Sequence, residues 1–159
     1  MKRILVFSDS HGYTENVNKI AELIDQVDYV YFLGDGYGDV QDLLYAYPNK
    51  VEAVIGNCDH YFDAPVTIIN KVENVTFLLT HGHAFHVKYG YEEMVYAAKR
   101  KKVDCVLFGH THSVLDDVYD GVRLINPGSL GNYFNGTYCI LTIADKNIQV
   151  ESINLLQNS

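Results

Sequence analysis

Five short apolar runs in the first 112 residues each end in polar side chains of the types that bind metal ions. The last run is followed by Gly109-His110-Thr111-His112, in which one residue separates two imidazoles. The other four runs end at Asp9 and His11, at Asp35 with Asp39 nearby, at Asn57 and Asp59, and at His81 and His83. Successive clusters are 22 to 29 residues apart, about the length of one strand and its return connection. Because groups beyond the carboxyl ends of strands in an open α/β sheet face one crevice, we expect these side chains to converge.

The spacing of apolar residues predicts which segments form strands and helices. We expect strands at 3–8, 28–33, 51–55, 66–72, 75–80 and 104–108, and helices at 15–26, 39–47 and 91–102. Thr14 is expected to cap the first helix. Beyond residue 113 the pattern changes to short strands at 114–119, 122–126, 137–144 and 148–154, with turn residues between them.

These elements predict an α/β fold in which two sheets pack face to face and helices lie outside. We expect β-α-β units up to about residue 108 and antiparallel strands after it. A plain Rossmann-type layer fits less well, because only three good helices are expected. With 159 residues the chain is long enough to form one domain, spanning 1–159, with a sizeable core.

Composition and charge indicate in which compartment the protein acts and which classes of partner it can bind. The three cysteines, at positions 58, 105 and 139, show no close pairing, which is typical of a reducing cytoplasm. No apolar segment approaches the ~20 residues of a membrane span, so no membrane partner is expected. The net charge of −8 would repel a nucleic acid, and the one basic run, at 99–102, fits the carboxyl end of a helix.

Each polar cluster also has an ordinary structural interpretation. Asp9 suits a helix cap, segments 34–36 and 56–57 suit turns, and His81 and His83 suit polar positions at a sheet edge. Coincidence in all five is hard to accept, because five of the chain's seven histidines lie in these clusters. A mixture of carboxylate, imidazole and amide groups suits Mn, Fe, Co, Ni or Zn. About seven ligands are too many for one tetrahedral ion and suit two ions.

Five motifs occur in one order and carry a family resemblance. They are Asp9-Ser10-His11, Gly34-Asp35, Gly56-Asn57-Cys58-Asp59, Thr80-His81-Gly82-His83 and Gly109-His110-Thr111-His112. The chain resembles the calcineurin-like metallophosphoesterases, and most of all their small, single-domain bacterial and archaeal phosphodiesterase branch. Asn126-Pro127-Gly128-Ser129 adds to the match. The resemblance implies a four-layer α/β sandwich, two mixed sheets with helices outside, that hydrolyses a small phosphodiester.

The resemblance also implies how the ligands divide between two divalent ions. Asp9, His11 and His112 would bind one ion, and Asn57, His81 and His110 the other. Asp35 would bridge the two ions, and a hydroxide between them would attack phosphorus in line. Manganese is expected first, with nickel, cobalt, iron and zinc as alternatives. His83 would lie close by, as a contact to the ligands or to the phosphate.

The sequence departs from the family pattern at two places, and the first departure puts the general acid in doubt. Cys58 stands where many relatives carry a histidine that protonates the leaving oxygen or holds the phosphate. A thiol, with a reference pKa of about 8.5, is a poor substitute at neutral pH. His60, His83 and His86 could take over that role, and His83 ranks first by its motif position. The loop after Asn126-Pro127-Gly128-Ser129 also lacks the basic residue that relatives often have.

Several alternatives stay open from the sequence. The first is a non-catalytic interaction scaffold like the eukaryotic retromer subunit of this fold, although that protein lacks part of the ligand set. A nuclease is disfavoured by the acidic composition. A phosphomonoesterase or a cyclic-nucleotide hydrolase is compatible with the motifs, and so is a homo-oligomer. Five tyrosines near predicted loops could stack on a substrate, although packing roles are about twice as common for such residues: Tyr37, Tyr61, Tyr89, Tyr91 and Tyr133.

Overall fold

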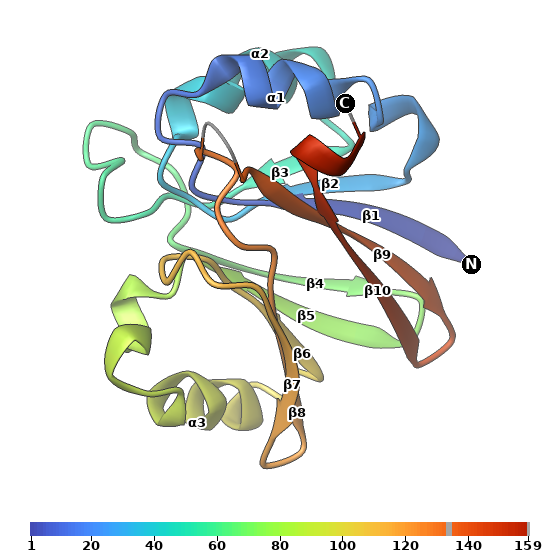
Figure 1. Cartoon of the computed structure of the whole chain (residues 1–159). Helices are drawn as coiled ribbons and strands as arrows, with labels where there is room; N and C mark the ends of the chain where they lie inside the picture. The colour runs from blue at the N-terminus through green and yellow to red at the C-terminus, as the bar shows by residue number, and fades with distance from the viewer. Residues whose placement is uncertain (133–134, 159) are drawn as a thin grey trace.

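The computed structural model describes residues 1–132 and 135–158, and within them ten strands form two five-stranded sheets (Figure 1). The first sheet has the order β10-β9-β1-β2-β3. Its strands are β1 (Lys2–Phe7), β2 (Tyr29–Phe32), β3 (Val51–Ala53), β9 (Thr137–Ala144) and β10 (Asn147–Asn154). The second sheet has the order β4-β5-β6-β8-β7. Its strands are β4 (Thr67–Val72), β5 (Val75–Thr80), β6 (Cys105–Leu107), β7 (Leu115–Tyr119) and β8 (Val122–Asn126).

Helices cover the outer face of each sheet, as Figure 1 shows. Helices α1 (Thr14–Ala21) and α2 (Gln41–Ala46) lie on the first sheet, and α3 (Glu92–Arg100) lies on the second. Five short 3-10 turns complete the described elements: η1 (Ile24–Gln26), η2 (Tyr37–Val40), η3 (His83–Phe85), η4 (Val87–Tyr89) and η5 (Leu155–Asn158). The layers are helix, sheet, sheet, helix, which confirms the predicted four-layer α/β sandwich. None of the described helices has the length and apolar character needed to cross a bilayer.

The structure of β1 explains why the sequence of this strand is a continuous apolar run. Ile4 and Val6 point between the two sheets, where they join the central core. Leu5 and Phe7 point the other way and pack under α1 and α2. Because successive side chains of a strand alternate between its faces and both faces are covered, all four residues are buried.

The direction of the strands places the polar clusters at one edge of the molecule. β1, β2 and β3 are parallel in the first sheet, and β5, β6 and β8 are parallel in the second. Their carboxyl ends therefore open into neighbouring loops, and backbone hydrogen bonds join those loops within each sheet. Asp9 N donates to Gly34 O at 2.9 Å, and Gly109 N donates to His81 O at 3.0 Å.

The expected division into a front part of β-α-β units and an antiparallel back part is wrong in one respect. The two C-terminal hairpins do not form a sheet of their own. The β9–β10 hairpin pairs antiparallel with β1, whereas β8 pairs parallel with β6. The hairpins cover strand edges that would otherwise be exposed, and hairpin patterns in a sequence do not show which edge they cover.

Several element boundaries also differ from the expectation. The helix expected at 15–26 ends at Ala21, and the chain then tightens into η1. Thr14 is the first helical residue, with no side-chain cap at this end, so its predicted capping role is wrong. The helix expected at 39–47 is a 3-10 turn followed by α2, and 91–102 shortens to Glu92–Arg100. The strand expected at 51–55 ends at Ala53, because the loop after it turns toward the polar clusters.

Candidate metal centre

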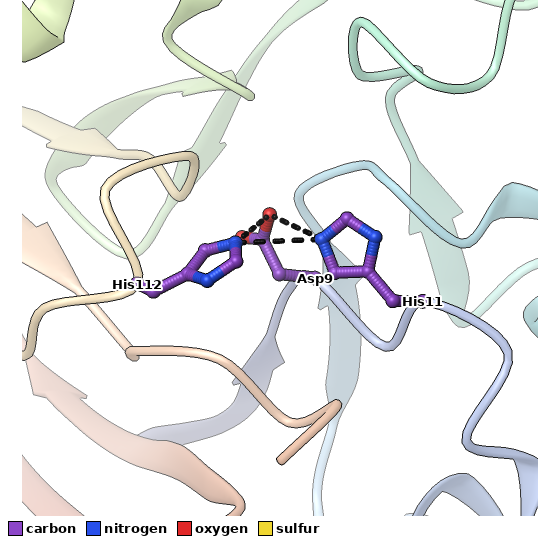
Figure 2. A group of neighbouring side chains, drawn as sticks. All are labelled: Asp9, His11 and His112. Atoms are coloured by element: carbon purple, nitrogen blue, oxygen red, sulfur yellow. Dashed lines mark hydrogen bonds and ion pairs between the residues drawn. The ribbon is translucent and has the colours of Figure 1, made fainter.

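A first group of candidate ligands consists of Asp9, His11 and His112, shown in Figure 2. Asp9 Oδ1 lies 3.1 Å from His112 Nε2 and 3.4 Å from His11 Nε2. The two Nε2 atoms are 3.4 Å apart. One carboxylate oxygen and two imidazole nitrogens therefore face a common point, an arrangement that suits a divalent cation of borderline softness.

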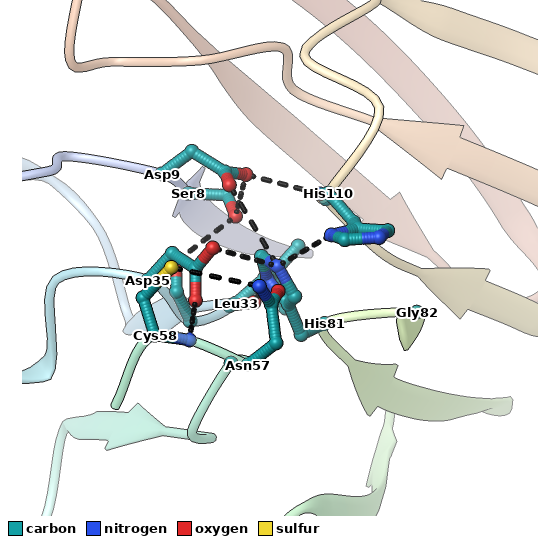
Figure 3. A network of polar contacts seen from close by, with 12 residues as sticks. Ser8, Asp9, Leu33, Asp35, Asn57, Cys58, His81, Gly82 and His110 are labelled. Atoms are coloured by element: carbon teal, nitrogen blue, oxygen red, sulfur yellow. Dashed lines mark hydrogen bonds and ion pairs between the residues drawn. The ribbon is translucent and has the colours of Figure 1, made fainter. Parts of the chain in front are cut away.

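A second group consists of Asp35, His81 and His110, shown in Figure 3. His81 Nε2 lies 3.2 Å from Asp35 Oδ2 and 3.1 Å from His110 Nδ1. On its other side His81 Nδ1 lies 2.8 Å from Leu33 O. A carbonyl oxygen can only accept, so Nδ1 carries a proton and Nε2 is the atom directed toward the other ligands.

The two groups share one site because Asp35 lies between them. Asp35 Oδ2 is 3.9 Å from His11 Nε2, and Asp9 Oδ1 is 3.8 Å from His81 Nε2. The other oxygen of Asp35, Oδ1, accepts a hydrogen bond from Cys58 N at 2.8 Å. One oxygen is therefore held by the backbone while the second faces both groups.

Five of the six residues in these groups have left-handed backbone conformations. The φ angles are 56° at Asp9, 45° at His11, 59° at Asp35, 70° at His110 and 62° at His112. Ten non-glycine residues in the described chain have positive φ, so half of them are candidate ligands. Such conformations are uncommon for residues other than glycine and cluster at functional sites.

Two glycines in the motifs are required by close packing around the ligands. A Cβ at Gly56 would overlap Asp35 Oδ1, and one at Gly109 would lie 2.6 Å from Asp9 Oδ2 and overlap Ser8 Oγ. A side chain at either position would displace a candidate ligand. The Gly-Asn and Gly-His pairs in the sequence therefore reflect the close approach of one loop to a carboxylate from another.

Two further carboxylates position the loops and belong to no candidate ligand group. The Asp59 carboxylate is buried and accepts backbone N–H bonds from Asp35 at 2.7 Å, Gly56 at 2.8 Å, and Gly36 and Tyr37 at 3.0 Å. It thereby joins the loop after β3 to the loop after β2. The Asp39 carboxylate accepts from Ser10 Oγ at 2.7 Å and from Gly12 N at 2.8 Å. Sequence reasoning placed both residues at strand ends without identifying these roles.

Asn126 and Ser129 explain the Asn126-Pro127-Gly128-Ser129 motif. The Asn126 amide donates to Gly109 O at 3.0 Å and to Thr111 Oγ1 at 3.1 Å. Ser129 Oγ donates to Asp9 O at 2.9 Å. The motif therefore holds the loop of His110 and His112 and links it to the loop after β1, across the two sheets.

The remaining candidates are more peripheral. Asn57 is exposed on the loop after β3, with its amide nitrogen 3.5 Å from Cys58 Sγ. Cys58 forms a third cluster of candidate ligand atoms with His11 and Asp35. The His83 ring centre is 5.5 Å from that of His81, and its Nδ1 is buried without a hydrogen-bond partner among the described residues.

Two histidines considered as alternative acids make other contacts. His86 Nδ1 lies 2.6 Å from Glu93 Oε2, and His60 packs on the ring of Tyr61 with ring centres 4.2 Å apart. Both histidines are exposed and belong to no candidate ligand group. Of the alternatives to Cys58, only His83 packs against a candidate ligand.

Of the five tyrosines considered from the sequence, two pack against other aromatic rings and two are exposed. Tyr37 packs on Phe62, and Tyr91 packs on Phe108 and on Tyr119, with ring centres 5.0, 5.5 and 5.2 Å apart. Tyr61 and Tyr89 are 87% and 92% exposed. Tyr133 lies outside the described residues.

The charges of the second group depend strongly on one another. Burial raises the pKa of Asp35, but hydrogen bonds and the charge of His81, together with Cys58 N–H, more than offset this and lower it well below its usual range. Burial lowers the pKa of His81, but Asp35 and Asp9 outweigh burial and raise it. The pKa of His110 falls to about 4, first through burial and then through the positive charge of His81. His110 is therefore neutral at pH 7, as a metal ligand must be.

The donor set fits divalent cations. Asp9 and Asp35 are both buried, and their ion-pair partners in the described chain are imidazoles, with no lysine or arginine among them. Two buried carboxylates need compensating charge, and His81, whose pKa is raised, supplies at most one positive charge in the metal-free site. Cations bound between the carboxylates and imidazoles would supply the remaining charge.

Comparison with known proteins identifies the family. A sequence profile of the calcineurin-like phosphoesterase superfamily domain matches residues 1–146. The chain belongs to this family. A relative in Bacillus subtilis, the probable metallophosphoesterase YsnB, is 32% identical over 130 residues, which cover 80% of this chain and 74% of that protein. The phosphodiesterase YfcE of Escherichia coli K12 is 29% identical, with 82% and 80% covered.

Solved structures support the fold assignment. A conserved protein from Streptococcus pneumoniae TIGR4, described as a predicted phosphoesterase, superposes with a TM-score of 0.83 at 25% identity. That match covers 96% of this chain and 89% of the other. A Vps29 single mutant from Entamoeba histolytica matches with a TM-score of 0.77 at 21% identity, covering 96% and 99%. The second likeness shows the fold alone. Family membership implies divalent metal ions and phosphoester hydrolysis, and the candidate ligand groups are consistent with both.

Proposed function

We propose that this protein is a phosphodiesterase that uses two divalent ions to hydrolyse a small phosphodiester. The observation that carries the proposal is the position of Asp35, a buried carboxylate with one oxygen facing both ligand groups. A shared carboxylate holds two cations at the spacing, about 3.5–4 Å, that suits in-line displacement at phosphorus.

We assign Asp9, His11 and His112 to one ion and His81 and His110 to the other. Asp35 would be shared by both ions. Asn57, which is exposed, would add its amide oxygen to the ligands of the second ion. An amide is uncharged, so it leaves that ion more electrophilic than a third carboxylate would. The order of expectation for the metal is manganese, then nickel, cobalt, iron or zinc.

The chain's own residues orient these ligands for the reaction. The bound ions would supply Lewis-acid activation of water and of the phosphoryl oxygens. The Leu33 carbonyl fixes the proton of His81 on Nδ1, and the Cys58 N–H restricts Asp35 to one ligating oxygen. We propose that His83, whose Nδ1 is buried without a partner among the described residues, contacts the phosphate.

A phosphomonoesterase and a non-catalytic scaffold are the alternative functions. The Vps29 likeness shows that the fold is shared and does not itself favour the scaffold. The convergence of six ligand-type side chains, five of them in uncommon backbone conformations, favours the enzyme, because a scaffold needs none of them. The site itself does not distinguish monoesters from diesters, since both present a phosphoryl group to the same ions.

We also propose that residues 1–159 form one domain that acts in the cytoplasm without nucleic-acid or membrane partners. The three cysteines are free, and two of them are buried. The net charge is −8. A homo-oligomer is compatible with this proposal.

The decisive experiment is a panel of substrates and metals. Protein stripped with a chelator is reloaded with Mn, Ni, Co, Zn or Mg and assayed on bis(p-nitrophenyl) phosphate, p-nitrophenyl phosphate and a cyclic nucleotide. We expect metal-dependent turnover of the diester and a metal content approaching two ions per chain. Faster turnover of the monoester would favour a phosphomonoesterase. Turnover of no substrate by fully loaded protein would favour the scaffold.

A further inference from the structure

A cleft of about 760 Å³ opens beside the first ligand group, and nothing so far assigns it a role. His11 and His112 line it, together with Ser129, Gly131, Asn132 and Asn135 from the loop that follows β8 and Thr137 at the start of β9. Its volume is in the range of pockets that hold a small organic ligand. A molecule in the cleft would therefore lie in contact with the proposed metal centre.

The lining of the cleft is uncharged and partly apolar. Apart from the two candidate ligands, the described lining residues include no histidine, lysine, arginine, aspartate or glutamate. Tyr13 and Val114 are two of the large apolar side chains that the protein leaves exposed, at 40% and 49%, and both lie here. The carboxylate of Asp39 in η2 accepts hydrogen bonds from Ser10 and Gly12, in the loop that carries Tyr13. Apart from the ion proposed at the first ligand group, an anionic group in this cleft would find no cationic partner among the described lining residues.

The backbone of Tyr13 is held by hydrogen bonds. Its N–H donates to Ser10 O at 2.9 Å, and its carbonyl accepts from Asn16 N at 3.1 Å. The loop that carries Tyr13 also carries His11, and both side chains line the cleft, so the exposed phenol lies beside the first ligand group. An exposed aromatic ring beside a reaction centre offers a flat surface to a flat ligand group. Sequence reasoning missed Tyr13 among the 13 tyrosines, although its position two residues after a candidate ligand was a usable signal.

The cleft lies on the opposite half of the centre from His83, the alternative proton donor that ranks first. His83 packs beside His81, a member of the second group, whereas Cys58 lies at the boundary between the groups, near both Asp35 and His11. Neither Cys58 nor His83 is among the described lining residues of the cleft. A leaving oxygen that receives a proton is therefore better placed near the second group, and the other ester oxygen near the first.

We propose that this cleft binds the ester group that stays on phosphorus, and that it selects a flat, uncharged group such as an aryl ring or a nucleoside. The proposal rests on the proposed phosphodiesterase function. In the reaction, a P–O bond forms to water while the P–O bond to the leaving group breaks. The leaving oxygen departs with that electron pair and gains a proton, and the retained ester becomes a monoester held against Tyr13.

The test keeps the leaving group constant and varies the retained group. Three p-nitrophenyl diesters carry methyl, phenyl or 5′-thymidyl as the retained group, and all release p-nitrophenolate. We expect kcat/KM to rise from methyl to phenyl and thymidyl. In Tyr13→Ala the phenyl-to-methyl and thymidyl-to-methyl ratios should fall by about 5- to 100-fold, the range for losing one aromatic stacking partner. Tyr45→Ala, a 91% exposed tyrosine on α2, is the matched control and should leave both ratios unchanged.

A charge test examines the same cleft independently. A thymidyl diester with an added 3′-phosphate should be a poorer substrate than its uncharged counterpart, and Asn135→Lys should reduce that difference. If Tyr13→Ala slowed all three diesters equally, the cleft would not bind the retained group. If the 3′-phosphate accelerated turnover in the unmodified protein, the uncharged selectivity would be wrong.

Equilibrium binding separates this inference from the proposed function. Calorimetry of metal-loaded protein should show thymidine 5′-phosphate binding more tightly than methyl phosphate, with the preference lost in Tyr13→Ala. Tight, Tyr13-dependent binding with no turnover of any diester would contradict the proposed function and support the cleft. Turnover with no preference between the two monoesters would support the function and overturn the cleft.

Discussion

The two ligand groups lie side by side, yet the protein encloses their histidines very differently. The side chains of His11 and His112 in the first group are 33% and 50% exposed. The side chain of His81 in the second group is fully buried, and that of Asp35 is 4% exposed. Backbone groups of Leu33 and Cys58 also hold His81 and Asp35, whereas His11 and His112 line the cleft.

This difference in burial indicates that the two ligand groups have different tasks. Ligands oriented by buried hydrogen bonds keep their geometry without the metal, so the second group is a preorganised site. Exposed ligands can adjust, which suits the half that must admit and release an ester group. We therefore expect the second site to fill first as metal is added, and substrate selectivity to depend on the first.

The strongest test of the difference between the two ligand groups is a substitution of Asp35, which lies between them. Asp35→Asn keeps the shape of the side chain and an acceptor for Cys58 N–H, but it removes the bridging charge. We expect turnover to fall by about 10³-fold or more, beyond the 10–100-fold typical of an outer contact. Metal analysis should show at most one ion per chain. Asp63→Asn, an exposed acid on the loop after β3, is the control, and equal activity in the two variants would refute the bridge.

The next prediction compares His81→Ala with His112→Ala in protein kept free of metal by a chelator. Removing buried His81 leaves Asp35 without its imidazole partner, at a cost of about 3 kcal/mol in the free energy of unfolding. Removing half-exposed His112 should cost less than about 1 kcal/mol. Urea unfolding measures both, with exposed His60→Ala as the reference. Equal costs would show that the two halves are equally preorganised.

The raised pKa of His81 predicts how the metal-free protein responds to pH. A histidine whose pKa is higher in the folded state stabilises that state below its unfolded pKa of about 6.5, and this stabilisation is lost as pH rises through the folded value. Asp35, with a lowered pKa, contributes above about pH 4 and loses its contribution only in acid. The stability difference between the unmodified protein and His81→Gln should shrink above pH ~6.5. A difference that grows with pH would contradict the pairing.

The smallest effect is expected at Cys58, beside the boundary between the halves. Burial, and then the charge of Asp35, raise the pKa of this thiol, which makes it poorly matched to general acid catalysis near neutral pH. Cys58→Ala should change turnover of activated aryl esters by less than about 3-fold, far below the 10²–10⁴-fold typical of a lost general acid. Cys58→His should raise alkyl-ester turnover more than aryl-ester turnover. A large loss in Cys58→Ala confined to poor leaving groups would show that the thiol is the acid.

The sequence was sufficient for the four layers and for the convergence of the strand ends. Parallel strands separated by a fixed return length must bring Asp9, Asp35 and His81 to one edge, whatever the details of the loops. The sequence did not distinguish Asp59 from a ligand. A carboxylate that accepts four backbone N–H bonds and one that faces a cation occupy equivalent positions after a strand, and only the folded loops separate them.

Contacts between distant segments account for the other differences. The partners of the C-terminal hairpins depend on which strand edges are free, and the end of α1 depends on how Ile24 reaches the core. Tyr13 was overlooked because its exposure beside a cleft depends on the folded surface. The sequence alone does not show which of the tyrosines are exposed there. Local patterns thus predicted the elements, and packing decided their partners.

The left-handed backbone at five candidate ligands has a consequence for how such a chain evolves. Each costs the folded state on the order of 1 kcal/mol relative to glycine, which adopts this conformation without penalty. Selection for stability alone would therefore replace Asp9, His11, Asp35, His110 and His112 by glycine or asparagine. A descendant released from hydrolysis would gain robustness with each such replacement while keeping its sheets and helices. The first mutations fixed in a lineage that keeps the fold and abandons the chemistry should therefore fall on these candidate metal ligands.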